Sequence, residues 1–539
     1  MRSLQPSGDR VGRKSRIGLI GASMLAVSVA LAAGHVTGQN VQHLSQPFAG
    51  GMPGLPVVTG VSKISNGLSV TWDGPAGYYQ LFESADLERR KWAALGRATN
   101  LDRVASVIGQ PGNAFFRVVG PSPQYAGSEQ CVECHSPIAT TEKHTAHGSA
   151  FADPPFVAYG GQTNASCLIC HTVGFGLPTG FSSAGQTPRL EGVQCENCHG
   201  PAARHAANPD DPLARPRAEI AATVCGGCHT GPEHPTFDEW QTSAHAQQPL
   251  AMTTSAQIND CGRCHSGSAR LSLLQGTSLP VGDNTMGIVC ITCHDPHQTN
   301  KYPAQLRNPI ASTNDYFMPT NGSFATHYKA NVNICAQCHN HAGAAWNNSA
   351  SAPHHSPQYN MLLGTIGELE SGETPHQPGS HALLLTNQCV DCHMQSSPYA
   401  GADRPAVTGH TFRVDRYDVC LKCHPYPQQL VTFATGAISN QVQQVKADLD
   451  YWAAHAAPAS LWEKYGNLAW EYTTPGELSG GGPGPDPAGQ KLIPENIQKA
   501  RFNLYIVLSD GSYGVHNPYY AVDLLNAAED WITEEVDKQ

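Results

Sequence analysis

The chain has 539 residues and a formal net charge of −11 at pH 7, with charged side chains at only 14% of its positions. Its length allows more than one domain. An acidic surface argues against nucleic acid as a partner and favours partners that present basic or cationic patches.

The first 33 residues have the pattern of a secretory signal peptide. Basic residues within 10–16 precede an apolar run over 17–33, and Ala30-Leu31-Ala32 resembles a small-residue cleavage site. The alternative is an uncleaved membrane anchor, but a run of 17 apolar residues is at the short limit for crossing a bilayer. We therefore predict cleavage near Ala32, export to the periplasm, cell surface or exterior, and no stable membrane span in the mature chain. Removal of five basic residues and Asp9 with this segment brings the net charge near −15.

Residues 34–55 are Gly- and Pro-rich without periodicity, which predicts a flexible leader. Short alternating runs follow at 68–72, 78–82, 103–108 and 115–119, separated by turn sequences at 73–75 and 110–112. We predict a small antiparallel β-sandwich-like domain over residues 56–120. It resembles a short fibronectin type III sandwich, and we expect it to dock or space the rest of the chain.

Nine copies of Cys-x-x-Cys-His account for all 18 cysteines. This is the attachment signal for c-type haem: the two thiols form thioether bonds to the porphyrin and the adjacent imidazole binds the iron as proximal ligand. Zinc sites combine Cys-x-x-Cys pairs two at a time and need no histidine after each pair, while thioredoxin-like pairs need a βαβ context that is missing here. We therefore predict nine covalently bound c-type haems, attached in chain order through Cys131 and Cys134, Cys167 and Cys170, Cys195 and Cys198, Cys225 and Cys228, Cys261 and Cys264, Cys290 and Cys293, Cys335 and Cys338, Cys389 and Cys392, and Cys420 and Cys423. The corresponding proximal ligands are His135, His171, His199, His229, His265, His294, His339, His393 and His424.

The predicted haem domain, residues 121–425, contains an internal repeat. Motif starts are 36 and 28 residues apart in the first trio and 36 and 29 in the second, which indicates duplication of a trihaem unit over 131–205 and 225–297. A third unit over 327–424 has gaps of 54 and 31 and requires an insertion. Haem faces supply apolar area that a small domain otherwise lacks. We expect a mainly α domain with much irregular loop and few strands.

Residues 426–539 change character. Val442, Val445, Leu449 and Trp452 recur at helical spacing, Pro494 opens a second run to residue 508, and a third run covers 520–532. We predict helices that pack on the haem domain.

Distal ligands are predicted among the histidines outside the motifs. His354 and His355 are adjacent and compete for one role; His355 stands at the same offset from Cys335 as His245 does from Cys225. The set chosen by position is His147, His205, His245, His297, His327, His355, His381, His410 and His516. Ordinary surface or propionate-bonded histidines are expected at His144, His234, His341, His376 and His455, and a methionine ligand remains an alternative at one iron through Met252, Met286 or Met394.

Three stretches within residues 125–425, namely 192–201, 239–245 and 389–394 followed by Gly409-His410, carry a family resemblance. They resemble the multihaem cytochromes that include pentahaem nitrite reductase, hydroxylamine oxidoreductase and the tetrahaem electron carrier of ammonia oxidisers. Residues 510–518 are similar to the tail of the same group. The resemblance implies closely stacked haem pairs and bis-histidine ligation at most irons. Nine haems fit none of these proteins, and no motif ends in lysine as the catalytic haem of nitrite reductase does, which argues against nitrite reduction.

The sequence therefore favours a non-catalytic electron carrier, with no catalytic residue assigned. Its expected partners are redox proteins, either other cytochromes or quinol-linked electron donors. The alternative is a multihaem oxidoreductase acting on a small nitrogen or sulfur compound at one five-coordinate haem, with His354, His355 and Tyr359 or the pair Tyr328-Lys329 as acid, base or anion-binding groups. A homo-oligomer or filament, in which conduction continues between chains, is a further alternative.

Overall fold

The structure is a computed structural model that describes residues 28–32, 57–64, 67–73, 79–84, 93–99, 104–108, 113–119, 124–177, 179–210, 215–216, 220–247, 252–277, 286–298, 303–307, 334–344, 346, 351–370, 378–474 and 483–538. It divides into two compact units. The first comprises Met1–Cys228 with Pro296–Thr299, and the second comprises His229–Asp295 with Asn300–Gln539. The division falls inside the fourth motif.

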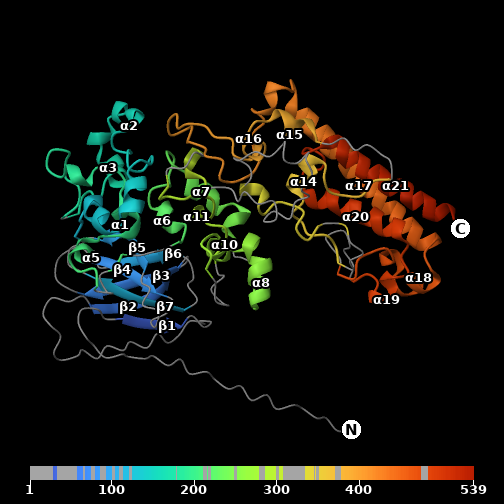
Figure 1. The fold of residues 1–539 in the computed structure, drawn as a ribbon, viewed down its shortest axis with the longest axis horizontal. Coiled ribbons are helices and arrows are strands. Elements are labelled where there is room, and N and C mark those ends of the chain that lie inside the picture. Colours follow the sequence, from blue (N-terminus) through green and yellow to red (C-terminus); the bar gives the residue numbers. More distant parts are fainter. Residues whose placement is uncertain are drawn as a thin grey trace, which may run out of the picture. The chain divides into compact units, whose positions relative to one another are not determined.

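The first unit begins with two antiparallel sheets, drawn in blue in Figure 1. One has the strand order β1-β7-β4-β5 and the other the order β2-β3-β6. Side chains at alternate positions face one side of a strand, and Val70, Trp72, Leu81 and Phe116 meet in the core between them. The strands are β1 (Ser28–Ala32), β2 (Val57–Ile64), β3 (Gly67–Asp73), β4 (Tyr79–Ser84), β5 (Ala93–Thr99), β6 (Val104–Ile108) and β7 (Asn113–Val119).

The strands β3, β4, β6 and β7 correspond to the four predicted runs, and the expected antiparallel sheets are present. The strands β2 and β5 were not predicted, because Gly60 and Gly96 interrupt their alternation. Strand β1 lies inside the predicted signal segment and pairs antiparallel with β7, from Ser28 opposite Arg117 to Ala32 opposite Asn113. Cleavage near Ala32 would leave β7 as an edge strand.

The rest of the first unit is built from short helices joined by loops. Its small apolar cluster is formed by Phe151, Leu168, Val173, Phe181 and Leu190. The helices are α1 (Ser128–Glu142), α2 (Pro154–Ala158), η1 (Gly161–Thr163), α3 (Ala165–His171), η2 (Pro188–Leu190), α4 (Cys195–His199), α5 (Ala203–Ala207) and α6 (Thr223–Gly226).

The second unit continues in the same style up to the ninth motif. Apart from isolated bridges, the described residues here contain no strand, as the sequence led us to expect. The helices are α7 (Thr236–Gln241), η3 (Ala244–Ala246), α8 (Ser255–Asp260), α9 (Gly262–His265), α10 (Gly267–Leu274), α11 (Cys290–Cys293), η4 (Pro303–Gln305), α14 (Gln358–Leu363), α15 (Ser380–Leu384), α16 (Cys389–His393) and η6 (Cys420–Lys422).

The largest apolar core of the described chain lies after the ninth motif. The long helices α17 (Pro427–His455), α20 (Glu495–Asp510) and α21 (Pro518–Asp537), orange to red in Figure 1, pack side by side. The predicted stripe Val442, Val445, Leu449 and Trp452 is fully buried on α17, as amphipathic spacing requires. Shorter helices α18 (Ala459–Tyr465), η7 (Gly466–Leu468) and α19 (Pro487–Gln490) complete this region. No helix among the described residues has the length and apolar character needed to span a bilayer.

Candidate metal centres

Each described motif lies on one short helical turn that ends at or near its histidine, as in α3, α4, α9 and α16. Residues three apart share one face of such a turn, so the two sulfurs of a motif point the same way. Local capping fixes two of these turns: the Asn164 side chain accepts from the Ser166 N–H before α3, and Gln194 with Asn197 forms a capping box on α4. All 18 cysteines are described, and all are free thiols. They are therefore available for thioether bonds.

Five motif histidines lie opposite a second imidazole at a nearly constant separation. A metal–imidazole bond is about 2 Å long, so two imidazoles on opposite sides of one metal ion place their ring centres roughly 6 Å apart. The observed separations between ring centres are 5.9 Å for His199 and His297, 6.1 Å for His339 and His245, and 6.2 Å for His294 and His410, His424 and His381, and His393 and His516. Every pair joins a predicted proximal histidine to a predicted distal one, from segments far apart in the sequence.

Hydrogen bonds at Nδ1 orient these rings. His294 bonds to the Ala304 carbonyl at 2.7 Å, His393 to the Phe412 carbonyl at 2.9 Å and His381 to the Val515 carbonyl at 2.8 Å. A carbonyl can only accept, so Nδ1 carries the proton and the lone pair is left on Nε2, the atom that a metal would bind.

Burial disfavours the charged form of several of these imidazoles, and an imidazole must be neutral to bind a metal ion. It lowers the pKa of His245 to about 4, with the charge of His339 adding to the effect. Burial also lowers the pKa of His294, His339 and His410.

His516 is the exception. Burial alone would lower the pKa of His516, but the charge of Asp510 and a 2.6 Å hydrogen bond from Nδ1 to Asp510 Oδ1 outweigh it, so that pKa is raised. Asp510 is itself 4% exposed. This ring therefore has a carboxylate behind it where His294, His381 and His393 have carbonyls.

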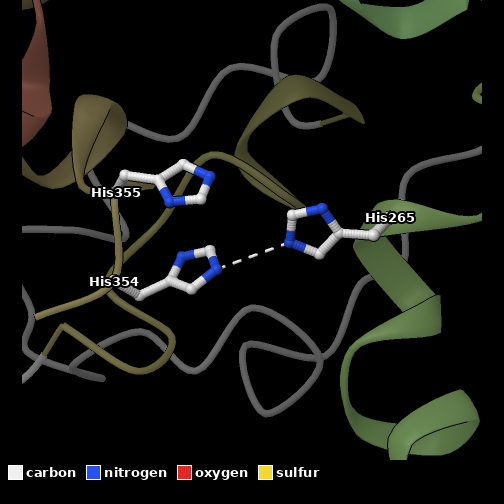
Figure 2. Close-up of side chains that lie close together, drawn as sticks. All are labelled: His265, His354 and His355. Atoms are coloured by element: carbon white, nitrogen blue, oxygen red, sulfur yellow. Dashed lines mark hydrogen bonds between the residues drawn. The ribbon is translucent and has the colours of Figure 1, made fainter. Parts of the chain in front are cut away.

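The fifth motif faces two imidazoles rather than one. Figure 2 shows His265, at the end of α9, pointing at His354 and His355, which come from one loop. One ligating atom from each residue lies within 4.8 Å of the others. The ring of His355 is centred 6.1 Å from that of His265, and the ring of His354 is centred 5.5 Å away. Sequence reasoning had the two adjacent histidines competing for one role and selected His355 for it.

The other predicted ligands have different surroundings. His171 stacks on Phe156 with 4.1 Å between ring centres and bonds through Nδ1 to the Ala150 carbonyl, while His135 lies at a kink in α1. Burial lowers the pKa of His147. His229 accepts a hydrogen bond at its backbone carbonyl from the Phe237 N–H. His327, with the Tyr328-Lys329 pair, lies outside the described residues.

Among the described residues, no hydrogen-bond partner reaches the buried Nδ1 of His205 or of His341. We expected His205 to be a distal ligand and His341 to be an ordinary histidine. A buried nitrogen without a protein partner is what a bound group absent from the structure would leave at each of these two histidines. Tyr359, considered as an acid, is instead buried and donates its hydroxyl to Gln388. His455 stacks on Tyr451 at the surface, as an ordinary histidine would.

Motifs distant in sequence lie against one another within each unit. In the first unit the sulfurs of Cys131 and Cys195 lie close enough together to interact, which brings the first and third motifs side by side. In the second unit the Cys264 thiol reaches the Gln337 carbonyl at 3.8 Å and the Cys338 thiol reaches the Arg263 carbonyl at 3.9 Å, a reciprocal contact of the fifth and seventh motifs.

Three further sulfur contacts extend this network in the second unit. The sulfurs of Cys335 and Cys389, of Cys293 and Cys335, and of Cys392 and Cys420 each lie close enough together to interact electrostatically. The seventh motif therefore neighbours the fifth, sixth and eighth, and the eighth neighbours the ninth. These contacts connect the five motifs of this unit without a gap.

Two buried or half-buried carboxylates hold ligand segments in place, and neither was identified from the sequence. Glu239 of α7 accepts from the Thr408 N–H, the Thr408 hydroxyl and the His410 N–H at 2.7–2.9 Å. Glu196 of α4 accepts from the backbone N–H groups of Ala126, Gly127 and Ala202 at 2.7–3.0 Å. Each glutamate thus fixes a ligand-bearing segment to another part of its unit.

Comparison with known proteins finds similarity to multihaem cytochromes. Residues 130–200 match the family model described as cytochrome c554 and c-prime. The chain is 23% identical over 285 residues to the C-type polyheme cytochrome OmcB of Geobacter sulfurreducens, covering 48% of this chain and 35% of OmcB. It is 33% identical over 90 residues to cytochrome c-554 of Nitrosomonas europaea, covering 14% of this chain and 38% of that protein. With the multiheme cytochrome MtrA of Shewanella baltica it shares 26% identity over 183 residues, covering 30% of this chain and 51% of MtrA.

The chain thus spans about a third of the length of OmcB, the first curated relative it matches (35%). Its fold is similar to that of the outer cell wall cytochrome OcwA, with a TM-score of 0.51, 20% sequence identity, and coverage of 76% of this chain and 99% of that one. The motif helices, the facing imidazoles and these similarities together support one conclusion. The chain belongs to the multihaem c-type cytochromes.

Proposed function

We propose that this protein is an exported cytochrome with nine covalent haems that carries electrons between redox partners. The five facing histidine pairs, separated by 5.9–6.2 Å between ring centres, are the observation on which the proposal chiefly rests. Haem iron, when bound, alternates between its ferrous and ferric states and so accepts and releases single electrons.

The residues do three things for that chemistry. The cysteines of each motif would anchor one haem on a helical turn, and the two facing imidazoles would bind its metal. A metal with both axial positions filled by protein has no open site for a substrate. Nδ1 hydrogen bonds to fixed carbonyls keep the ligands oriented in both redox states, so little rearrangement accompanies electron transfer.

The contacts between motifs support a continuous route within the second unit. Neighbouring sulfurs at the fifth, sixth, seventh, eighth and ninth motifs imply that the groups attached there are also neighbours. In the first unit the same argument applies to the first and third motifs.

Export and partners are part of the proposal. The apolar segment at 17–33 supports export, and OcwA, whose fold is similar, is an outer cell wall cytochrome. A net charge of −11 favours partners with basic patches around their electron-transfer sites, such as other cytochromes or quinol-linked donors. Self-association into an oligomer or filament would extend the same route between chains.

Spectroscopy of the fully haemylated protein tests the proposal. We expect only low-spin signals in the oxidised protein and no carbon monoxide binding after reduction, because each iron would be saturated. A high-spin signal, carbon monoxide binding at one haem and turnover of nitrite, hydroxylamine or tetrathionate would instead support the alternative of a multihaem oxidoreductase.

A further inference from the structure

The fifth motif has one more imidazole than a single iron needs. His354 and His355 are consecutive residues, and both rings face His265 in Figure 2. Each of the five pairs described above brings one distal ring to one motif histidine. Two rings stacked face to face, with 4.4 Å between their centres and 21° between their planes, cannot both bind the same side of one metal ion. The two rings are therefore alternative ligands for one position on the metal.

His354 is the better anchored of the two. Its Nε2 lies 3.4 Å from Nε2 of His265, and its Nδ1 is 2.8 Å from the Ser356 hydroxyl. That hydroxyl donates to the Asn340 carbonyl at 2.9 Å, and Ser356 is 7% exposed. A buried hydrogen-bond chain of this kind fixes a ligand's ring orientation. Asn340 directly follows the seventh motif, so the chain anchors His354 to a rigid part of the unit.

His355 is positioned but not tethered. Its ring centre is 6.1 Å from that of His265, within the range of the other pairs, yet the side chain is exposed. Its ring stacks on that of His354 and lies edge-on to that of His265, while its backbone carbonyl accepts a hydrogen bond from the Gln358 side chain. An imidazole held in this way rotates more easily about its side-chain bonds than one bonded through Nδ1.

We propose that His354 and His355 form a redundant ligand pair for the iron attached at Cys261 and Cys264, with His354 bound at rest and His355 able to replace it. This inference rests on the proposed function. In the exchange the bond from His354 Nε2 to the iron breaks and one from a ring nitrogen of His355 forms. Both imidazoles are neutral, so no proton or electron is gained or lost. The position would be six-coordinate in each of the two ligation states.

The two ligation states differ chemically. His354 is bonded to Ser356 through Nδ1 and is half-buried, whereas His355 is exposed. Hydrogen bonding and burial of an axial ligand tune the reduction potential of a haem. Exchange of one histidine for the other therefore gives the fifth position two potentials, and the route through the second unit contains a site whose potential depends on which ring is bound.

The test compares H354A, H355A and the double variant H354A/H355A, each purified with its full haem complement checked by mass. H381A is the matched control, because His381 is the described partner of His424 and has no neighbouring histidine in the chain. Carbon monoxide bound per reduced protein and the spin state of the oxidised protein are measured. We expect each single variant at 354 or 355 to bind no more carbon monoxide than the parent. The double variant and H381A should each bind one equivalent more.

Spectra of H354A decide the inference even when the double variant does not retain its haems. A low-spin signal at a changed position supports replacement by His355. A new high-spin signal with one added equivalent of carbon monoxide overturns it. An unchanged spectrum in H354A, with a changed one in H355A, also overturns it by making His355 the resting ligand. If H381A gains no carbon monoxide site, the paired-histidine basis of the proposed function fails, independently of the redundancy.

Discussion

Replacing Asp510 by asparagine should raise the reduction potential of the eighth haem. Asp510 Oδ1 accepts a 2.6 Å hydrogen bond from Nδ1 of His516, the ring that faces His393. Its carboxylate also accepts from Ser512 and is buried. A negative charge behind an axial ligand strengthens that ligand and stabilises ferric over ferrous iron. Asparagine keeps the acceptor oxygen and the shape but removes the charge.

The size of the shift follows from the distance between the charges. Adding the imidazole ring and a metal–nitrogen bond of about 2 Å to the hydrogen bond puts the carboxylate roughly 6–7 Å from the iron. With an effective dielectric constant of about 20, one unit charge at that distance contributes about 2.5 kcal/mol. For a one-electron couple, in which 59 mV is a tenfold change, this corresponds to an increase of about 100 mV.

A redox titration followed by optical and electron paramagnetic resonance spectra measures the effect. One of the haem potentials should rise in D510N and the others should stay. D537N is the control, because Asp537 is an exposed carboxylate at the end of α21. A D510N protein in which every potential stays within about 30 mV of the parent, or in which one falls, would refute the electrostatic argument.

Other predictions concern the supports of the ligands and the haem count. E239A removes the acceptor of three hydrogen bonds from Thr408 and His410, so we expect the free energy of unfolding to fall by about 2 kcal/mol or more and a fraction of the sixth haem to bind carbon monoxide. E239Q retains one acceptor oxygen, and its stability and carbon monoxide binding should lie between those of the parent and E239A. Equal behaviour of the three proteins would contradict this role of Glu239. Burial raises the pKa of Glu142 to about 7. Because the folded state disfavours the charged form of Glu142, the contribution of this group to stability is greatest below the ordinary carboxyl pKa of about 4 and is lost as the pH rises through about 7. E142Q should therefore flatten the pH dependence of the thermal midpoint in this range, and an unchanged slope would contradict the argument. Intact mass spectrometry should give the mature polypeptide plus nine haem groups, and a smaller number would remove one or more motifs from the proposal.

The order of the helices after the ninth motif could be predicted because their patterns are local. Val442, Val445, Leu449 and Trp452 are buried on α17 at the spacing that predicted them. The first half of α17 was not predicted, because its exposed residues Leu430 and Phe433 give no clean stripe. Strands β2 and β5 were also missed, since their alternation is broken and their pairing depends on neighbours elsewhere in the chain.

The predicted attachment points can be read from the sequence alone. Two sulfurs and an imidazole within five residues form one turn of chain, so covalent attachment requires no information from the rest of the fold. It also narrowed the distal ligands to a set of histidines, six of which face a motif histidine among the described residues, counting His355.

Only the tertiary structure decided which of them face each other. His516 reaches His393 across more than a hundred residues, and His245 reaches His339 from before two intervening motifs. Loops without periodic patterns make these connections, so no local rule encodes their path. Tertiary packing also brings the second imidazole to His265 and places the carboxylates of Glu239 and Asp510 behind the ligands. Their roles come from packing between distant segments, and a side chain's electrostatic effect on a metal site depends on distance in space rather than on position in the chain.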